Sequence, residues 1–185
     1  MTINNIASVF EYPRELGNEK VLLRPLRETD FESLYAVASD PLIWEQHPNK
    51  ERYRRPVFEN YFKGAIESKS AYLVTDNVSG EIIGCSRYYD FNATNMTICI
   101  GYTFLSRKCW GKSFNRSLKE VMLNHAFQFA DTVIFHVGHH NLRSQKAMEK
   151  LGAVITGQEE MSYYGEPPQT NIVYNIKKDQ WKTKV

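Results

Sequence analysis

The sequence predicts a layered domain of the α/β (α+β) class, in which helices pack on a mixed, largely antiparallel sheet. Short runs rich in β-branched and aromatic residues, typical of strands, are interspersed with longer amphipathic runs typical of helices. Their order is strand, two helices, three strands, helix, strand, helix and two strands. This order lacks the regular strand–helix alternation of a doubly wound nucleotide-binding fold. A chain of 185 residues is most simply one domain, so we expect residues 1–185 to form a single unit.

The first part of the chain combines one strand with two helices. Residues 20–26 (KVLLRPL) have the pattern of a strand that ends at a proline. Asp30 is placed to cap a helix over residues 31–39, and Pro41 is expected to stop that helix. Apolar residues at helical spacing predict a second helix over residues 55–69.

The middle of the chain predicts three strands and a long helix. Residues 71–76 and 81–91 flank the turn sequence NVSG, which indicates an antiparallel hairpin. Residues 96–105 (MTICIGYTFL) form the next expected strand. A helix then begins at Phe114. Its apolar stripe consists of Leu118, Val121, Met122, Ala126 and Phe129.

The last part of the chain predicts three more strands and a helix. Residues 132–138 (TVIFHVG) are short, β-branched and aromatic, and indicate a buried strand. Asn141 is suited to cap the following helix, and Gly152 is suited to end it. Residues 153–164 and 170–178 complete the sheet.

Composition argues against several classes of protein. The chain is 42% hydrophobic and 24% charged, with a net charge of +2, which gives no reason to expect nucleic acid or a membrane as a partner. It has no run of about 18 apolar residues, and its first residues lack the order of a signal peptide. Cys85, Cys99 and Cys109 are too widely spaced for a disulfide framework or a CxxC metal site. We therefore expect a cytoplasmic protein with reduced thiols.

The segment 107–123 (RKCWGKSFNRSLKEVML) resembles a loop that runs into a helix N-terminus, where proteins can bind phosphate. Gly111 can make the turn, and Ser113 and Asn115 can supply side-chain donors, with Asn also tolerating the left-handed backbone region. The GxxxxGK[ST] spacing of a Walker A loop is absent. A solvated basic helix start explains the same residues equally well. The basic residues here are Arg107, Lys108, Lys112 and Arg116.

Three ordered motifs, IGYTF (100–104), WGKSFNRSLKEVML (110–123) and NLRSQKAMEKLGA (141–153), resemble the GNAT superfamily of acyl-CoA-dependent N-acyltransferases. Within it, the chain is most similar to the branch of ribosomal-protein N-terminal (alanine/serine) acetyltransferases. The resemblance extends over residues 20–181. It implies a three-layer domain with a central sheet of about seven strands, helices on both faces, and a cleft where the fourth and fifth strands splay apart.

The resemblance also implies how acetyl-CoA, the acyl donor, is bound without a metal. Residues 110–115 would wrap the pyrophosphate, and pantetheine would pair with the backbone of residues 102–105. Relatives carry glycine, then glycine or alanine, where this chain has Ser113 and Asn115, and we expect these polar side chains to replace part of the backbone approach. The residues expected to hold acetyl-CoA are Tyr102, Thr103, Phe104, Leu105, Lys108, Trp110, Gly111, Lys112, Ser113, Phe114, Asn115, Arg116, Asn141 and Ser144.

The proton donor for the departing thiolate is expected on the helix after the fifth strand. Relatives often use a tyrosine at the position that is Met148 here. Ser144 remains as the catalytic candidate, because it matches the N-x-x-S pattern of the branch and shares a helical face with Met148 and Leu151. The alternative is that Ser144 only hydrogen-bonds the helix N-terminus.

The base that deprotonates the amine is less well defined. Relatives commonly carry an acidic residue where this chain has Cys99. His136 titrates in the useful range and is the candidate base, with a packed structural histidine or a chain of water molecules as open alternatives. Tyr88, Tyr89 and Asp90 follow at the end of the third strand and are expected to line the acceptor pocket.

The sequence lacks the residue patterns required for a metal site, for nucleophilic hydrolysis and for single-strand nucleic-acid binding. His139 and His140 are adjacent and therefore point apart, and no carboxylate or cysteine at a fixed spacing joins them as a metal ligand. A GxSxG nucleophile elbow is absent, and the aromatic residues are not interleaved with a basic stripe as single-strand binding requires.

The resemblance implies direct transfer of an acetyl group from acetyl-CoA to a primary amine in a ternary complex. The acceptor would be a protein N-terminus or a small molecule, and we expect a monomer or homodimer with no nucleic acid or membrane partner. The alternative is a non-catalytic acyl-CoA-binding or sensing module, which Met148 and Cys99, in place of the usual catalytic groups, leave open.

Overall fold

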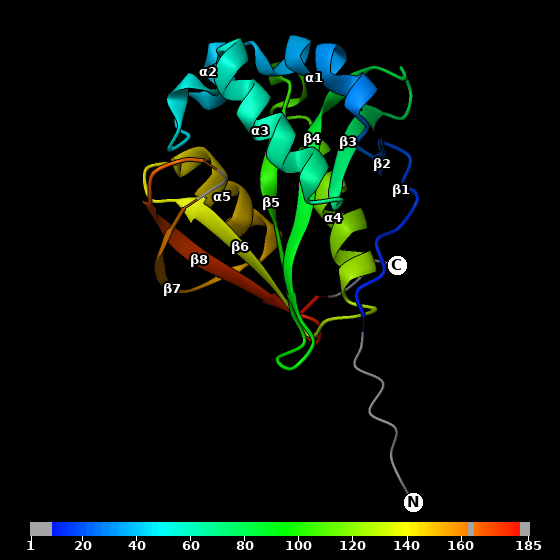
Figure 1. Cartoon of the computed structure of the whole chain (residues 1–185). Helices are drawn as coiled ribbons and strands as arrows, with labels where there is room; N and C mark the ends of the chain where they lie inside the picture. The colour runs from blue at the N-terminus through cyan, green and yellow to red at the C-terminus, as the bar shows by residue number, and fades with distance from the viewer. Residues whose placement is uncertain (1–8, 163–164, 182–185) are drawn as a thin grey trace, which may run out of the picture.

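The computed structural model describes residues 9–162 and 165–181, and Figure 1 shows a central sheet with helices on both faces. Within this part of the chain the sheet has eight strands in the order β1-β2-β3-β4-β5-β6-β8-β7, which confirms the predicted class. The strands are β1 (Leu16–Gly17), β2 (Val21–Pro25), β3 (Ala71–Asp76), β4 (Ile82–Asn92), β5 (Thr97–Leu105), β6 (Thr132–Gly138), β7 (Val154–Met161) and β8 (Gln169–Lys177). The helices are α1 (Phe31–Ala38), α2 (Pro41–Trp44), α3 (Arg55–Glu67), α4 (Phe114–Ala126) and α5 (Leu142–Leu151), with 3-10 turns η1 (Glu28–Asp30), η2 (Lys50–Tyr53) and η3 (Arg107–Cys109).

The strand pairs of the described sheet are antiparallel except for β5 and β6. These two strands are parallel because the chain crosses over through α4 between them. β8 lies between β6 and β7 and pairs with both. The parallel pair therefore joins the larger N-terminal part of the sheet to the C-terminal strands.

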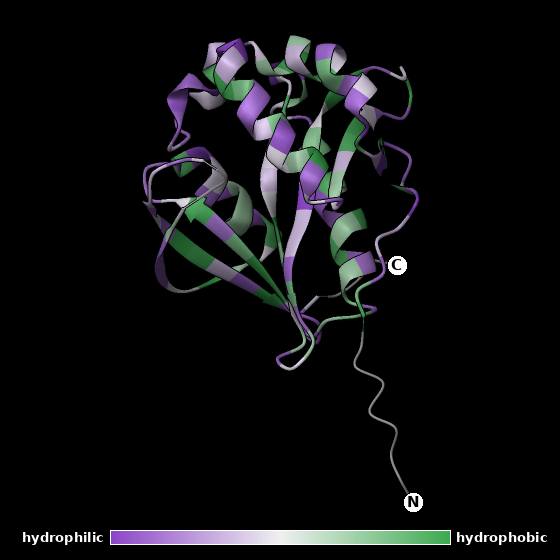
Figure 2. Ribbon diagram, in the orientation of Figure 1, coloured by the Kyte–Doolittle hydropathy of each residue, from purple (hydrophilic) through white to green (hydrophobic). Residues whose placement is uncertain are grey.

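Two apolar clusters, one on each face of the sheet, hold the layers together. Leu34, Trp44 and Phe58 of the first three helices pack on one face with Leu73 of β3. The adjacent residue Tyr72 points to the opposite face, because successive side chains of a strand alternate between the two faces. That face is covered by α4 and α5. Figure 2 shows hydrophobic residues concentrated along the strands and hydrophilic residues on the outward turns of α1 to α3.

Two predictions for the N-terminal helices are wrong. Asp30 does not cap α1, because its carboxylate accepts a hydrogen bond from the backbone N–H of Arg27 at 2.8 Å and pairs with Arg24 at 2.7 Å. It closes the η1 turn instead. Pro41 does not stop α1, which ends before it. Pro41 is the first residue of α2, where the missing N–H removes no helical hydrogen bond, and Asp40 caps that helix.

The other elements agree with the predicted ones, with small shifts at their ends. β1 is an additional strand, and α4 ends at Ala126, before Phe129. The strand expected over 153–164 is observed as β7; Tyr163 and Tyr164 lie outside the described residues. None of the helices in the described ranges is long and apolar enough to cross a bilayer.

Candidate active site

The pairing of β5 changes along its length. Its residues Thr97–Cys99 pair in parallel with Thr132–Ile134 of β6. Farther along, β6 remains paired with β8, whereas no strand of the described chain pairs with this side of β5 from Ile100 to Leu105. The two strands thus separate and leave a strand edge inside the sheet. The splayed strands that the family resemblance implies are present at this position.

A β-bulge in β5 fixes the backbone beside this split. The register between β4 and β5 shifts between Cys85 and Arg87, which inserts an extra residue into β5. Tyr102 in the bulge has a φ of 52°, in the left-handed region that L-residues seldom adopt. Its carbonyl accepts a hydrogen bond from the hydroxyl of Tyr61 in α3 at 2.7 Å, and its ring lies 4.1 Å from the Arg87 guanidinium. Contacts with α3 and β4 therefore hold the strained conformation.

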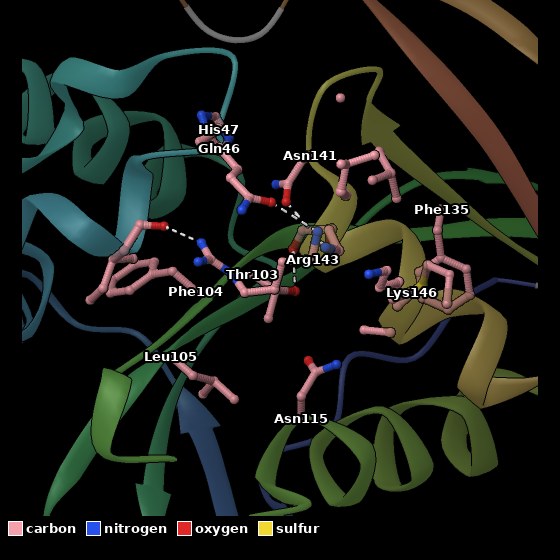
Figure 3. Close-up of a pocket in the computed structure, with 18 of the residues that line it drawn as sticks. Gln46, His47, Thr103, Phe104, Leu105, Asn115, Phe135, Asn141, Arg143 and Lys146 are labelled. Atoms are coloured by element: carbon pink, nitrogen blue, oxygen red, sulfur yellow. Dashed lines mark hydrogen bonds between the residues drawn. The ribbon is translucent and has the colours of Figure 1, made fainter. Parts of the chain in front are cut away.

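A cavity of about 640 Å³ occupies the split, a volume typical of small-molecule sites. Figure 3 shows its lining contributed by β5, β6, α5 and the start of α4. The lining also includes Trp44 of α2 and Arg52 of η2, which belong to the opposite helical layer. The cavity therefore reaches elements on both faces of the sheet.

The loop before α4 contains two left-handed residues. Gly111 has a φ of 72°, which confirms that it makes the turn. The second is Ser113, with a φ of 65°, whereas Asn115 lies inside the first turn of α4. Ser113 is the cap residue, yet its side chain makes no capping hydrogen bond. The backbone N–H groups at this helix start are therefore left for an anion in the adjoining cavity.

The cations around the cavity are not those expected from the loop. Arg107, Lys108 and Arg116 pair with surface carboxylates and do not line it. No Asp or Glu occurs among the described residues of the lining. The lining is therefore electropositive, which suits a multiply charged anion such as coenzyme A. Its basic residues are Lys119, Arg143, Lys146 and Lys150, together with Arg52, which is paired with Glu166 outside the lining.

Most residues expected to hold acetyl-CoA line the cavity. They are Tyr102, Thr103, Phe104, Leu105, Trp110, Gly111, Ser113, Asn115, Asn141 and Ser144. Lys108, Lys112, Phe114 and Arg116 are not part of the lining. The Phe114 ring is covered by Lys20, whose ammonium lies 5.0 Å from the ring centroid and donates to the Lys112 carbonyl at 2.8 Å. These contacts stabilise the loop on the side that faces away from the cavity.

The start of α5 forms another wall of the cavity. The Asn141 side chain accepts from the backbone N–H of Ser144 at 3.1 Å, which confirms the predicted cap. Sequence analysis missed Arg143, for which no local pattern gives a signal. Its guanidinium stacks 3.9 Å from the Trp110 ring centroid and donates to the Ile43 carbonyl at 3.0 Å. Arg143 thereby ties α5 to α2 beside the cavity, as Figure 3 shows.

His136 of β6 lines the cavity with only 6% of its side chain exposed. Its Nε2 lies 3.5 Å from a carboxylate oxygen of Glu159, and its Nδ1 lies 2.8 Å from the Tyr89 hydroxyl. A carboxylate only accepts, so this arrangement assigns the proton to Nε2 and leaves Nδ1 as the acceptor for Tyr89. Burial lowers the pKa of His136, although Glu159 and Asp90 act in the opposite direction. The imidazole is therefore neutral at pH 7 and able to take up a proton.

The three residues expected in the acceptor pocket lie in different environments. Tyr88 is buried in the core and donates to the Met122 carbonyl at 2.7 Å, so it is a packing residue and not a pocket residue. Tyr89 adjoins the cavity through His136. Asp90 is exposed, with a φ of 50° at the irregular end of β4.

The two positions at which the family resemblance implied an acid and a base hold inert groups. Cys99 is buried, and burial raises the pKa of its thiol to about 12, so the thiol stays protonated at pH 7. Met148 lines the cavity but has no proton to donate. Within residues 9–162 and 165–181, no group of His, Cys, Asp and Glu side chains is arranged to hold a metal ion.

Lys119 is the second residue that sequence analysis missed. It lines the cavity from α4 and is only 3% exposed. Its Nζ donates to the Thr103 hydroxyl of β5 at 2.6 Å. Helical periodicity held a signal for this placement, because Lys119 lies four residues after Asn115 and three before the buried Met122.

A family model for the acetyltransferase (GNAT) domain matches residues 20–154. Because this match covers most of the sequence, the chain belongs to the GNAT acetyltransferase family. The matched segment contains the unpaired β5 edge, the loop before α4 and the start of α5.

Solved structures share the fold at low sequence identity. A GCN5-related N-acetyltransferase from Brucella melitensis has a TM-score of 0.75 and 18% identity, covering 92% of this chain and 82% of that chain. Spermidine N-acetyltransferase from Vibrio cholerae, solved with CoA and spermine, has a TM-score of 0.66 and 18% identity, covering 88% and 98%. Ribosomal-protein-S5-alanine acetyltransferase from Vibrio fischeri has a TM-score of 0.65 and 18% identity, covering 91% and 99%.

Proposed function

We propose that this protein transfers an acetyl group from acetyl-CoA to a primary amine by direct attack in a ternary complex. The proposal is based on the cavity in the β5–β6 split, which reaches elements on both faces of the sheet. A donor bound along one face and an amine that enters from the other can meet there. Holding both reactants in one cavity removes the need for a covalent enzyme intermediate.

The cavity walls match the parts of the donor. The pyrophosphate would bind the N–H groups of Gly111 and residues 113–115, where the cap of α4 leaves donors available. Pantetheine amides would pair with the open β5 edge from Ile100 to Leu105. Lys146 and Lys150, one helical turn apart on α5, add positive charge beside the phosphates.

His136 and Ser144 are the proposed catalytic groups among the predicted residues. A primary amine with a pKa of about 10.4 is mostly protonated at pH 7, so a base assists it. Neutral His136 accepts from the Tyr89 hydroxyl at Nδ1, so the amine proton would reach it through that hydroxyl. The Ser144 hydroxyl, in the first turn of α5, would donate a hydrogen bond to the departing sulfur.

Thiol release from acetyl-CoA tests this function. The amine panel should include peptides that begin with alanine or serine, as well as spermidine and other small amines, because relatives are named for both kinds of acceptor. We expect coenzyme A to bind, and at least one amine to gain an acetyl group as free thiol appears. Binding without turnover across the panel would instead favour the acyl-CoA sensing module.

A further inference from the structure

Lys119 is a buried ammonium group without a carboxylate partner in the described structure. Burial is the only cause that shifts its pKa, and its one hydrogen bond runs to the neutral Thr103 hydroxyl at 2.6 Å. Its Nζ also lies 5.7 Å from the Phe135 ring centroid of β6. The amine thus lies between the two strands that separate to form the cavity.

A structural role does not explain this lysine. Thr103 already has a hydroxyl partner, Ser86 of β4, at 2.8 Å, so it does not need the lysine to satisfy its hydrogen bonding. A buried cation lowers stability, and an apolar residue would fill this part of α4 at less cost. An ammonium carries three N–H donors, and Thr103 takes one. The remaining donors are available to a ligand in the cavity.

We propose that Lys119 donates the proton that the coenzyme A thiolate takes up when it leaves. The inference rests on the proposed function. In the step, the amine nitrogen bonds to the thioester carbonyl carbon, the carbon–sulfur bond breaks, and its electron pair stays on sulfur. The sulfur takes a proton from the Lys119 ammonium, which becomes a neutral amine. The acceptor nitrogen gives its proton to the Tyr89 hydroxyl, which passes its own proton to Nδ1 of His136, and solvent restores the protonation of Lys119 and His136.

The environment of Lys119 suits this role. Burial lowers its pKa to about 7, below the roughly 8.5 of an ordinary thiol, so proton transfer to the thiolate is downhill. Met148 has no proton to give, and the Ser144 hydroxyl is a much weaker acid than an ammonium group. Ser144 can still orient the sulfur by a hydrogen bond.

The groups that contact the Lys119 ammonium from the neighbouring strands are Thr103 and Phe135, and Ser86 lies behind Thr103; none of them titrates near neutral pH. Other titratable or charged groups share the cavity. They are His47, Arg52, Tyr102, Cys109, His136, Arg143, Lys146 and Lys150. His136 accounts for an acidic limb, because its pKa is lowered from the ordinary value.

Lys119→Met removes the proton and keeps most of the side-chain volume. We expect kcat to fall by about tenfold to a hundredfold, at or below the lower end of the range for general acid catalysis, because a thiolate can also leave unassisted. The coenzyme A Kd should change by less than about threefold. At saturating acceptor, the kcat/KM for acetyl-CoA should decline above pH 7 in the wild type. The same quantity should not decline above pH 7 in Lys119→Met. The matched control Lys150→Met should raise the KM for acetyl-CoA and retain the decline.

Lys119→Arg separates proton donation from charge. Arginine stays protonated, so this variant should be as impaired as Lys119→Met. Full activity of Lys119→Arg would overturn the proposal, and so would a wild-type profile without the decline or an acetyl group found on Lys119 after turnover. If the wild type releases no thiol with any amine, the proposed function fails. If the wild type is active and Lys119→Met matches it in kcat and pH profile, only the role of Lys119 fails.

Discussion

Ser113 begins α4 in a left-handed conformation that costs a non-glycine residue about 1–2 kcal/mol. Its side chain is exposed and forms no capping hydrogen bond that would offset this cost. The conformation nevertheless leaves the helix start open to the cavity. A loop with one glycine thus reaches the geometry expected of a glycine-rich loop by accepting local strain.

Ser113→Gly should therefore stabilise the protein. We expect the free energy of unfolding to rise by about 0.5–1 kcal/mol, since the relief of strain exceeds the added entropy of the unfolded chain. Urea denaturation measures this change. The control Ser117→Gly, inside the same helix, should lower stability by about 0.5–1 kcal/mol. Destabilisation by both substitutions would contradict the account of the loop.

Lys119 should make stability depend on pH. Its pKa is about 7 in the folded protein and about 10.4 in the unfolded chain, so the unfolded chain binds more protons between these values. The contribution of Lys119 to the free energy of unfolding therefore rises with pH across this window. Lys119→Met should be more stable than the wild type at pH 7, and the difference should shrink by on the order of 1 kcal/mol per pH unit towards pH 9. Denaturation at pH 7, 8 and 9 measures the difference, and a constant value would count against a buried, proton-releasing lysine.

The start of α5 contains two residues with different roles. Asn141 caps the helix, and Ser144 lines the cavity. Asn141→Ala removes the cap and should cost about 1 kcal/mol of stability. Ser144→Ala removes no side-chain hydrogen bond of the described structure and should leave the melting temperature nearly unchanged while lowering kcat by about tenfold. Thermal unfolding and steady-state kinetics of the two variants measure both effects. A Ser144→Ala variant with wild-type kcat would make this serine purely structural.

Local patterns predicted these elements better than they predicted the site. The caps at Asn141 and Gly152 follow from residue type and position, and the fold class follows from the order of elements. The bulge at Tyr102 depends on a hydrogen bond from Tyr61, which is distant in sequence, so no local pattern shows it. The same limit explains why the basic residues of the loop were assigned to the cofactor. Arg107 and Lys108 pair with carboxylates that are distant in sequence, so the tertiary structure sets these pairs, whereas Arg116 pairs with Glu120 one turn on in the same helix.

At the scale of the whole molecule, one buried ion pair joins distant parts of the chain around the cavity. Arg52 of η2 pairs with Glu166, in the connection between β7 and β8, at 2.5 Å, with side-chain exposures of 3% and 8%. The Arg52 guanidinium also lies over the rings of Trp44 and Tyr61. The pair therefore fixes the C-terminal hairpin connection against the helical layer.

Glu166→Gln should lower the free energy of unfolding by about 3 kcal/mol, because it leaves a buried guanidinium without its counter-charge. The control Glu120→Gln disrupts a surface pair with Arg116 and should cost less than about 0.5 kcal/mol. Chemical denaturation of the two variants measures the contrast. Equal, small effects would show that the Arg52 pair does not hold these elements together.

In the proposed binding mode, coenzyme A lies in the split between β5 and β6, along the open β5 edge and the start of α4. Amide hydrogen exchange with and without coenzyme A tests it most directly. Residues 100–105 and 111–117 should exchange more slowly at saturating coenzyme A, because the ligand takes up backbone N–H groups at both places. Residues 154–161 of β7, on the far edge of the sheet, should be unaffected. Protection confined to other segments, or none at all, would contradict the account.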